Sequence, residues 1–170
     1  MNLILIGMRG SGKSTVAKIL SETLNLNLID VDKLIELKAK KSASDIIKTN
    51  GLEYFRDLES EIVQNLPDKN KSIIATGGGT VEREINMQAL KKDSLIIYLR
   101  TMPVTSAGRL ANICDRPVLT GAGSMREDLE NLYTIRKTVY EKWADIIVET
   151  DGKSFKEVAD SILRELFEKL

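Results

Sequence analysis

Short apolar runs alternate with amphipathic stretches along the whole chain. Residues 2–6 read Asn-Leu-Ile-Leu-Ile, a run with the length and composition of a buried strand. In residues 13–24, Val16, Ala17 and Leu20 recur at the spacing of one helix face. The same reasoning predicts strands over residues 2–6, 26–31, 72–76, 94–99 and 145–148, and helices over residues 13–24, 32–40, 43–49, 52–66, 81–90, 104–112, 126–142 and 155–170.

Alternating strands and helices predict an α/β fold in three layers, with a five-stranded parallel sheet covered by helices on both faces. The 170 residues are enough for one domain with a sizeable core. In such a sheet a ligand is expected across the carboxyl ends of the strands, at the switch point beside the first strand.

Residues 7–14 read Gly-Met-Arg-Gly-Ser-Gly-Lys-Ser, a complete G-x-x-x-x-G-K-[ST] phosphate-binding loop between a predicted strand and a predicted helix. Its glycines permit positive φ, and its N–H groups can cradle phosphate oxygens at the start of the helix. Lys13 is expected to reach the β- and γ-phosphates, and the Ser14 hydroxyl to bind Mg²⁺. A glycine-rich turn without a ligand is the alternative, which the complete string in this context disfavours. The residues expected to bind the ATP phosphates are Gly10, Ser11, Gly12, Lys13 and Ser14.

Two carboxylates, Asp30 and Asp32, follow the second predicted strand. One can hold a water molecule of a Mg²⁺ shell, and the other can orient or deprotonate an acceptor hydroxyl. The strand at 72–76 runs into glycine rather than into the aspartate of a Walker B motif, so Asp30 is expected on the metal side, through water. Asp32 is expected at the acceptor, although a plain helix cap is the alternative for it. No Asn-Lys-x-Asp string is present, which argues against a GTPase.

The chain contains three consecutive glycines after the third strand, Gly77, Gly78 and Gly79. They can let a substrate approach the backbone closely, and a tight turn is the alternative. Arg56 and Arg136 have the planar guanidinium group that grips a carboxylate through two hydrogen bonds. Each arginine taken alone also suits a solvated surface position, and spacing does not decide between the two.

Residues 113–124 contain Arg116, Pro117 and two glycines, and they are predicted to form a loop. Phosphoryl transfer requires the exclusion of water, so we interpret this loop as a lid that brings Arg116 to the transferred group. An ordinary surface loop is the alternative. Because the chain has no histidine, proton transfer must use a carboxylate, a lysine or water.

The chain has 25 basic and 25 acidic residues, a balance that does not favour a nucleic acid partner. The single cysteine, Cys114, excludes an internal disulfide and is typical of a reducing cytoplasm. No apolar run approaches the ~20 residues that span a bilayer, and the N-terminus lacks the features of a signal peptide. We therefore expect a cytoplasmic monomer with no membrane or nucleic acid partner.

The chain resembles the shikimate kinases over essentially its whole length, and the resemblance implies a P-loop fold of the nucleoside monophosphate kinase type. The strings that carry it are residues 7–14, Leu28-Ile29-Asp30-Val31-Asp32 with Ile35-Glu36, Gly51 with Phe55-Arg56 and Glu59, Thr76-Gly77-Gly78-Gly79, Arg109-Leu110, Arg116-Pro117-Val118-Leu119, and Leu132-Tyr133 with Arg136 and Tyr140. The phosphate loop alone is unspecific among NTPases, whereas the joint order of the other strings is much more specific.

The resemblance implies transfer of the γ-phosphoryl group of ATP to the 3-hydroxyl of shikimate, with Mg²⁺. By the same analogy, Lys13, Asp32 and Arg116 are catalytic, and Arg109 lies near the adenine. Substrate binding is assigned to a segment of about residues 32–61 and to Asp32, Arg56, Gly77, Gly78, Gly79 and Arg136.

Three positions depart from the family pattern. The family usually has a glutamate where this chain has Leu52, and a glycine within the string Ala39-Lys40-Lys41. It often has a phenylalanine at the position of Ile47. The first two changes are expected to alter only turns, and the third to change the apolar wall of the substrate pocket.

Two other functions compete with this interpretation. One is another small-molecule kinase on the same fold, such as a gluconate kinase-like or nucleoside monophosphate kinase-like enzyme. Arg56, Arg136 and the triple glycine favour a small carboxylated ring over a nucleotide. The other is a non-catalytic nucleotide-binding module, which the intact Lys13 and Asp32 disfavour.

Overall fold

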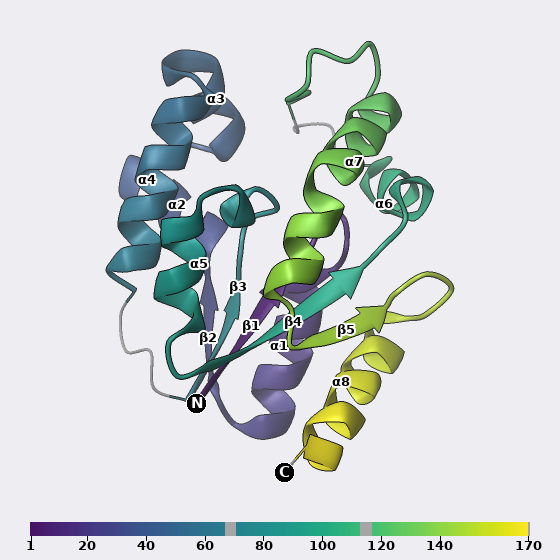
Figure 1. Cartoon of the computed structure of the whole chain (residues 1–170). Helices are drawn as coiled ribbons and strands as arrows, with labels where there is room; N and C mark the ends of the chain where they lie inside the picture. The colour runs from purple at the N-terminus through teal and green to yellow at the C-terminus, as the bar shows by residue number, and fades with distance from the viewer. Residues whose placement is uncertain (67–70, 113–116, 170) are drawn as a thin grey trace.

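The computed structural model describes residues 1–66, 71–112 and 117–169 (Figure 1). Within these ranges no helix combines the length and the apolar character needed to cross a bilayer. The strands are β1 (Asn2–Ile6), β2 (Asn27–Asp30), β3 (Ser72–Ala75), β4 (Ser94–Arg100) and β5 (Ile146–Glu149). The helices are α1 (Lys13–Leu24), α2 (Val31–Ala39), α3 (Ala43–Asn50), α4 (Leu52–Gln64), α5 (Glu84–Lys91), α6 (Pro103–Leu110), α7 (Met125–Trp143) and α8 (Phe155–Lys169), with a 3₁₀ turn, η1, over Thr80–Glu82.

The five strands form one parallel sheet in the order β2-β3-β1-β4-β5. β1 is central and pairs with β3 on one side and β4 on the other, for example through Ile4 opposite Ile74 and Ile96. The segments that follow β1, β2 and β3 therefore emerge at the same carboxyl edge. The predicted five-stranded α/β fold is confirmed, and the order of the strands places the switch point beside β1.

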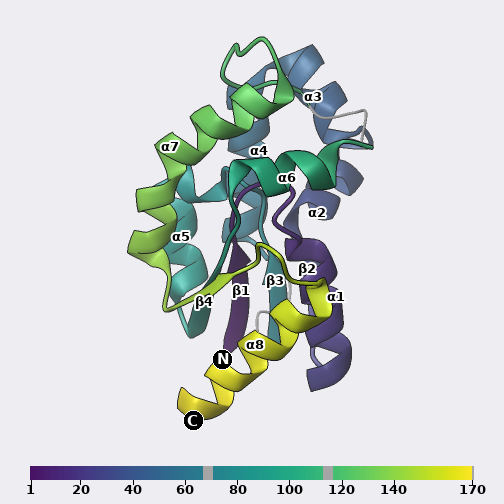
Figure 2. The same ribbon diagram turned by 90° about the vertical axis from the view of Figure 1, so that its right-hand side faces the viewer.

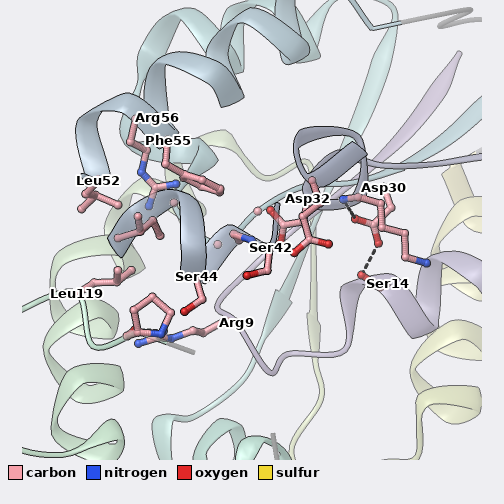
Figure 3. Close-up of a pocket in the computed structure, with 18 of the residues that line it drawn as sticks. Arg9, Ser14, Asp30, Asp32, Ser42, Ser44, Leu52, Phe55, Arg56 and Leu119 are labelled. Carbon is pink, nitrogen blue, oxygen red and sulfur yellow. Dashed lines mark hydrogen bonds between the residues drawn. The ribbon is translucent and has the colours of Figure 1, made fainter. Parts of the chain in front are cut away.

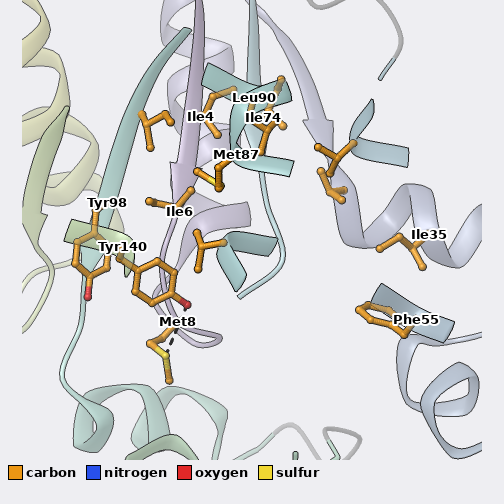
Figure 4. Packing of buried hydrophobic residues seen from close by; sticks show 14 of the residues in the cluster. Ile4, Ile6, Met8, Ile35, Phe55, Ile74, Met87, Leu90, Tyr98 and Tyr140 are labelled. Carbon is orange, nitrogen blue, oxygen red and sulfur yellow. Dashed lines mark hydrogen bonds between the residues drawn. The ribbon is translucent and has the colours of Figure 1, made fainter. Parts of the chain in front are cut away.

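Alternate residues of β1 enter two separate cores. Ile4 and Ile6 belong to a cluster with side chains from α4, α5 and α7 (Figure 4). Leu3 and Leu5 belong to a second cluster with α1 and α8. Figure 2 shows α1 and α8 on one side of the strands and α5 and α7 on the other. Because β1, β3 and most of β4 are buried on both faces, they read as nearly continuous apolar runs.

Among the predicted helix starts that differ from the structure, two have a clear local reason. α2 begins at Val31, and its N-cap is Asp30, whose Oδ1 accepts a hydrogen bond from Lys33 N at 3.3 Å. The capping role considered for Asp32 thus belongs to Asp30. The helix predicted over 81–90 is divided into η1 and α5, because Arg83 between them has an extended backbone.

A buried tyrosine pair predicts how stability depends on alkaline pH. Tyr98 and Tyr140 stack with ring centroids 4.9 Å apart, and burial raises the pKa of Tyr140 to about 12. Since an unfolded tyrosine ionises near pH ~10, the unfolded chain releases this proton first, and stability falls as the pH rises from about 10 to 12. The loss due to Tyr140 is on the order of 3 kcal/mol, because its pKa rises from ~10 to about 12 and each pH unit corresponds to about 1.4 kcal/mol.

Urea unfolding between pH 8.5 and 11.5 measures this loss. The free energy of unfolding of Tyr140→Phe should fall less steeply with pH than that of the wild type. That of Tyr54→Phe, which changes a half-exposed ring, should fall as in the wild type. Parallel declines for all three proteins would contradict the prediction.

Candidate active site

The phosphate-binding loop occupies the turn between β1 and α1, in the conformation that its glycines permit. Gly10 has φ of 77° and Gly12, the N-cap of α1, has φ of 92°. Lys13 is buried, and its Nζ donates hydrogen bonds to Gly7 O and Met8 O, both at 2.8 Å. Ser11 is fully buried within the loop. The ammonium group is thus held beneath the loop, beside the first turn of α1.

Ser14 and Asp30 lie together at the edge of the loop, where Ser14 Oγ donates a hydrogen bond to Asp30 Oδ2 at 2.7 Å (Figure 3). A hydroxyl and one carboxylate suit Mg²⁺, which usually takes few protein ligands and completes its shell with water and substrate phosphates. The described residues contain no cluster of three or more His, Cys, Asp or Glu side chains that could hold a metal by themselves.

Two cavities open at the carboxyl edge of the sheet. The first, of about 370 Å³, is lined by residues from α2, α3, α4, α7 and the glycine segment, including Asp32, Arg56 and Arg136. The second, of about 350 Å³, is lined by the phosphate-binding loop, Arg109 and Phe155. The residues that line both cavities are Arg9, Ser14, Asp32 and Gly78. The place where a phosphate chain would end therefore adjoins the place where a second molecule would bind.

Arg56 lies in the first cavity with only 6% of its surface exposed, so it is no solvated surface residue. Its Nη1 donates a hydrogen bond to Glu59 Oε2 at 2.9 Å, one helix turn along α4. Glu59 is fully buried, and its other oxygen accepts a hydrogen bond from Thr80 at 2.6 Å. This buried pair fixes the direction of the Arg56 guanidinium.

Arg136, from α7, is 2% exposed and approaches the same cavity from the opposite side. Its Nε donates a hydrogen bond to Glu82 Oε1 at 2.6 Å, and Glu82 Oε2 lies 3.7 Å from Arg56 Nε. One carboxylate of η1 therefore lies between the two guanidinium groups. Sequence reasoning did not single out Glu82, because nothing in the sequence shows that η1 faces both arginines.

Each of the three glycines makes room for a polar group of the site. A Cβ at Gly77 would lie 2.6 Å from Glu59 Oε1 and 2.9 Å from Asp32 Oδ1. A Cβ at Gly78 would lie 3.4 Å from Arg136 Nη1, and one at Gly79 would overlap the Arg56 guanidinium. A tight turn alone would not require glycine at all three positions.

We predict that Gly79→Ala raises KM for the acceptor by about tenfold or more, because the methyl group displaces Arg56 and overpacking is destabilising. KM for ATP should change by less than about threefold, since the phosphate loop is untouched. Steady-state kinetics with each substrate varied in turn measures both. Gly108→Ala is the matched control, because no described atom lies within 4 Å of a Cβ there. Equal effects of the two substitutions would contradict this explanation of Gly79.

Arg109 borders the second cavity. Its guanidinium donates hydrogen bonds to Ser11 O at 3.2 Å and Thr150 O at 3.1 Å, and lies 5.0 Å from the centroid of the Phe155 ring. Burial lowers the pKa of Arg109. The Phe155 ring also occupies the space that a Cβ at Gly12 would need. Sequence reasoning placed Phe155 at a helix start but missed its position beside the phosphate loop.

The apolar wall of the first cavity includes Ile47, Leu52 and Phe55. Gly51 joins α3 to α4 with φ of 91°, which explains the glycine there. The sequence predicts that the leucine at position 52, where the family usually has a glutamate, alters only a turn. Leu52 lines the cavity, so this difference also changes the lining of the pocket. Arg116, predicted to act from the lid, lies outside the described residues.

A parallel sheet of this strand order, with a phosphate-binding loop after the central strand and the first cavity beside that loop, is the P-loop fold of the nucleoside monophosphate kinase type. The comparisons with known proteins narrow this class. The family model of shikimate kinase matches residues 9–167. The chain belongs to the shikimate kinase family, a family of ATP-dependent kinases.

Individual relatives agree with this assignment. The shikimate kinase of Thermodesulfovibrio yellowstonii is 37% identical over 99% of this chain and 96% of its own length. That of Dictyoglomus turgidum is 38% identical over 97% of this chain and 96% of its own. The structure of shikimate kinase from Acinetobacter baumannii in complex with shikimate superposes with a TM-score of 0.93 at 28% identity, covering 99% of this chain and 93% of that one. The structure of shikimate kinase from Aquifex aeolicus superposes with a TM-score of 0.84 at 32% identity, covering 99% of this chain and 98% of that one.

Proposed function

We propose that this chain transfers the γ-phosphoryl group of ATP to the 3-hydroxyl of shikimate, giving shikimate 3-phosphate and ADP on the route to chorismate and the aromatic amino acids. The observation that carries the proposal is the junction of the two cavities at Asp32, with the phosphate loop on one side and two buried arginines on the other. This arrangement suits a small anionic alcohol placed beside a triphosphate.

Asp32 is proposed to accept a hydrogen bond from the acceptor hydroxyl and to orient it towards the γ-phosphorus, or to take its proton. Its position on the border of both cavities supports this role. Lys13 would hold the β- and γ-phosphates and neutralise charge that spreads over the equatorial oxygens in the transition state. Backbone N–H groups of Gly10, Ser11 and Gly12 would cradle the phosphate chain.

Mg²⁺ is proposed to be held by Ser14 directly and by Asp30 through water. When bound, it neutralises charge on the phosphate oxygens. The hydrogen bond between Ser14 and Asp30 keeps the two ligand groups adjacent. On the nucleoside side, Arg109 and the Phe155 ring would provide a flat surface for the base.

Arg56 and Arg136, with the backbone of residues 77–79, are proposed to bind the shikimate carboxylate. Glu82 already interacts with the Nε edges of both guanidinium groups, which shows that the two cations converge closely enough to share one carboxylate.

Arg136→Ala is expected to raise KM for shikimate about 10–100-fold, the effect of losing ~1.5–3 kcal/mol from a hydrogen bond to a charged group. The methyl ester of shikimate should be much less sensitive to this substitution, because it lacks the charge that Arg136 binds. Arg126→Ala, in the exposed first turn of the same helix, is the matched control and should leave KM unchanged. A similar loss for acid and ester would contradict the assignment.

We further propose that the chain works as a single-domain cytoplasmic monomer with no nucleic acid or membrane partner, and that residues 32–61 form the substrate-binding segment. The equal numbers of acidic and basic residues and the continuous five-stranded sheet support this. Residues 113–124 are proposed to act as a lid that carries Arg116 to the transferred phosphoryl group. Pro117 and Leu119 of this segment line the first cavity, in keeping with that role.

A coupled ADP-release assay with shikimate, quinate, gluconate and AMP as acceptors tests the proposal. We expect kcat/KM to be highest for shikimate by at least about a hundredfold, because quinate and gluconate also carry a carboxylate but place their hydroxyl groups differently relative to it, and a misplaced acceptor slows the transfer. Comparable or greater turnover with gluconate or AMP would instead favour another small-molecule kinase. ADP release that is independent of any acceptor would overturn the kinase assignment.

A further inference from the structure

Arg9 is part of the phosphate-binding loop, but its side chain leads away from the phosphate cradle. Its Nη1 donates a hydrogen bond to Pro117 O at 2.7 Å, and its Nη2 forms an ion pair with Asp128. The Arg9 side chain is 7% exposed and that of Asp128 is fully buried. The pair thus connects the loop after β1 to a segment more than a hundred residues further along the chain.

Asp128 lies in the first turn of α7 and organises the backbone that precedes this helix. Its Oδ1 accepts hydrogen bonds from Leu119 N at 2.9 Å, from Thr120 N at 2.7 Å and from Thr120 Oγ1 at 2.8 Å. Its other oxygen pairs with Arg9. A buried carboxylate with this number of donors is a well-satisfied anchor, and removing one partner leaves a buried charge uncompensated.

The backbone of Arg9 contacts the opposite wall of the first cavity. A Cβ at Gly78 would lie 3.1 Å from Arg9 N, so the phosphate loop packs directly on the glycine segment. Gly78 O in turn accepts a hydrogen bond from Tyr140. Pro117 and Leu119 line the first cavity, and Arg9 lines both cavities.

We propose that Arg9 and Asp128 form a brace that fixes residues 117–120 at a set position relative to the phosphate-binding loop. This part of the proposed lid segment then stays in place as one wall of the acceptor cavity. Arg9 is then a positioning residue for the acceptor and not a phosphate ligand. The inference rests on the proposed function for its kinetic consequence, while the brace itself is a property of the chain without substrates. A misplacement of the acceptor by a fraction of an ångström is enough to slow an in-line transfer.

Three variants test the brace: Arg9→Gln, Asp128→Asn and the two combined. With whichever of the four acceptors the wild type phosphorylates, each single variant should raise KM for that acceptor about tenfold, and KM for ATP less than about threefold. In the double variant, KM for the acceptor should lie within about twofold of its value in either single variant, because the two substitutions remove the same interaction. Arg9→Lys keeps the charge but not the planar fork, and it should give an intermediate KM.

Arg100→Gln is the matched control, because Arg100 also pairs with a carboxylate of α7, Glu141, but lines neither cavity. It should leave KM for the acceptor unchanged. Amide hydrogen exchange in the absence of substrates provides a second, independent measurement of the brace. The amides of Leu119 and Thr120 should exchange at least about tenfold faster in Arg9→Lys and Asp128→Asn than in the wild type, because their acceptor is no longer held.

The acceptor that the wild type phosphorylates tests the proposed function. The KM values of the variants relative to the wild type test the brace. Multiplicative effects in the double variant, an unchanged KM for the acceptor in Arg9→Lys, or unchanged exchange at Leu119 and Thr120 would overturn it. So would an Arg100→Gln variant that raises KM for the acceptor as much as Arg9→Gln does.

Discussion

Replacing Asp32 by asparagine is expected to lower kcat for shikimate phosphorylation about 10²–10³-fold, the range in which a positioned acid or base contributes. The amide retains the shape of the side chain, but it cannot take a proton and orients a hydroxyl less strongly. Although Asp32 borders both cavities, it is given no role in holding the phosphates, so the affinity for ATP should change little. Single-turnover kinetics at saturating substrate, together with a nucleotide binding titration, separates the two effects.

Asp57→Asn is the control for this substitution. It removes one negative charge from α4, where the Asp57 side chain is 73% exposed and pairs with Arg83. We expect its kcat to stay within about twofold of the wild type, since surface ion pairs contribute little. An Asp32→Asn variant with unchanged kcat would show that Asp32 only supports the first turn of α2.

Lys13→Ala should also reduce kcat by about 10²–10³-fold, the scale on which removal of one preorganised donor slows a reaction. The Lys13 ammonium is buried and is held by Gly7 O and Met8 O, so its position before ATP binds is already fixed. ATP affinity should fall as well, because the same charge binds the ground-state phosphates. ADP formation in the presence of shikimate, followed over a range of ATP concentrations, measures both.

Shikimate binding to Lys13→Ala should stay near that of the wild type, because Lys13 lines only the second cavity. Lys18→Ala removes an exposed cation from the same helix and should behave as the wild type. Phosphorylation of shikimate by Lys13→Ala at a near-normal rate would contradict the role given to the phosphate-binding loop.

Periodicity predicted most of the fold because β1, β3 and most of β4 are buried on both faces and the helices present apolar stripes. β1 and α1 have the bounds that their apolar patterns indicate, and the sheet has the five predicted strands. The predicted helix boundaries were wrong where a polar cap or the backbone conformation determines the start of the helix. Asp30 caps α2 through Lys33 N, and the extended Arg83 divides a helix that the pattern of apolar residues joined.

The sequence indicated the phosphate loop and Asp32 because both follow predicted strands, whereas Arg56 and Arg136, which lie within α4 and α7, were assigned only through the family resemblance. It did not show which partners hold them. Glu82 lies between Arg56 and Arg136 only because η1 turns back towards α7. Arg9 reaches Asp128 across a long separation in sequence, and no local pattern reports such a contact. The triple glycine was linked to substrate access, whereas the structure also explains it by the side chains packed against it.

The proposed reaction requires the two cavities to hold donor and acceptor in line across Asp32. A crystal structure with shikimate, Mg²⁺ and a non-hydrolysable ATP analogue would show this arrangement. We expect the 3-hydroxyl oxygen beside Asp32 and about 3–3.5 Å from the γ-phosphorus, with the carboxylate between Arg56 and Arg136. Shikimate bound elsewhere, or with its ring reversed so that the carboxylate faces the phosphates, would contradict it.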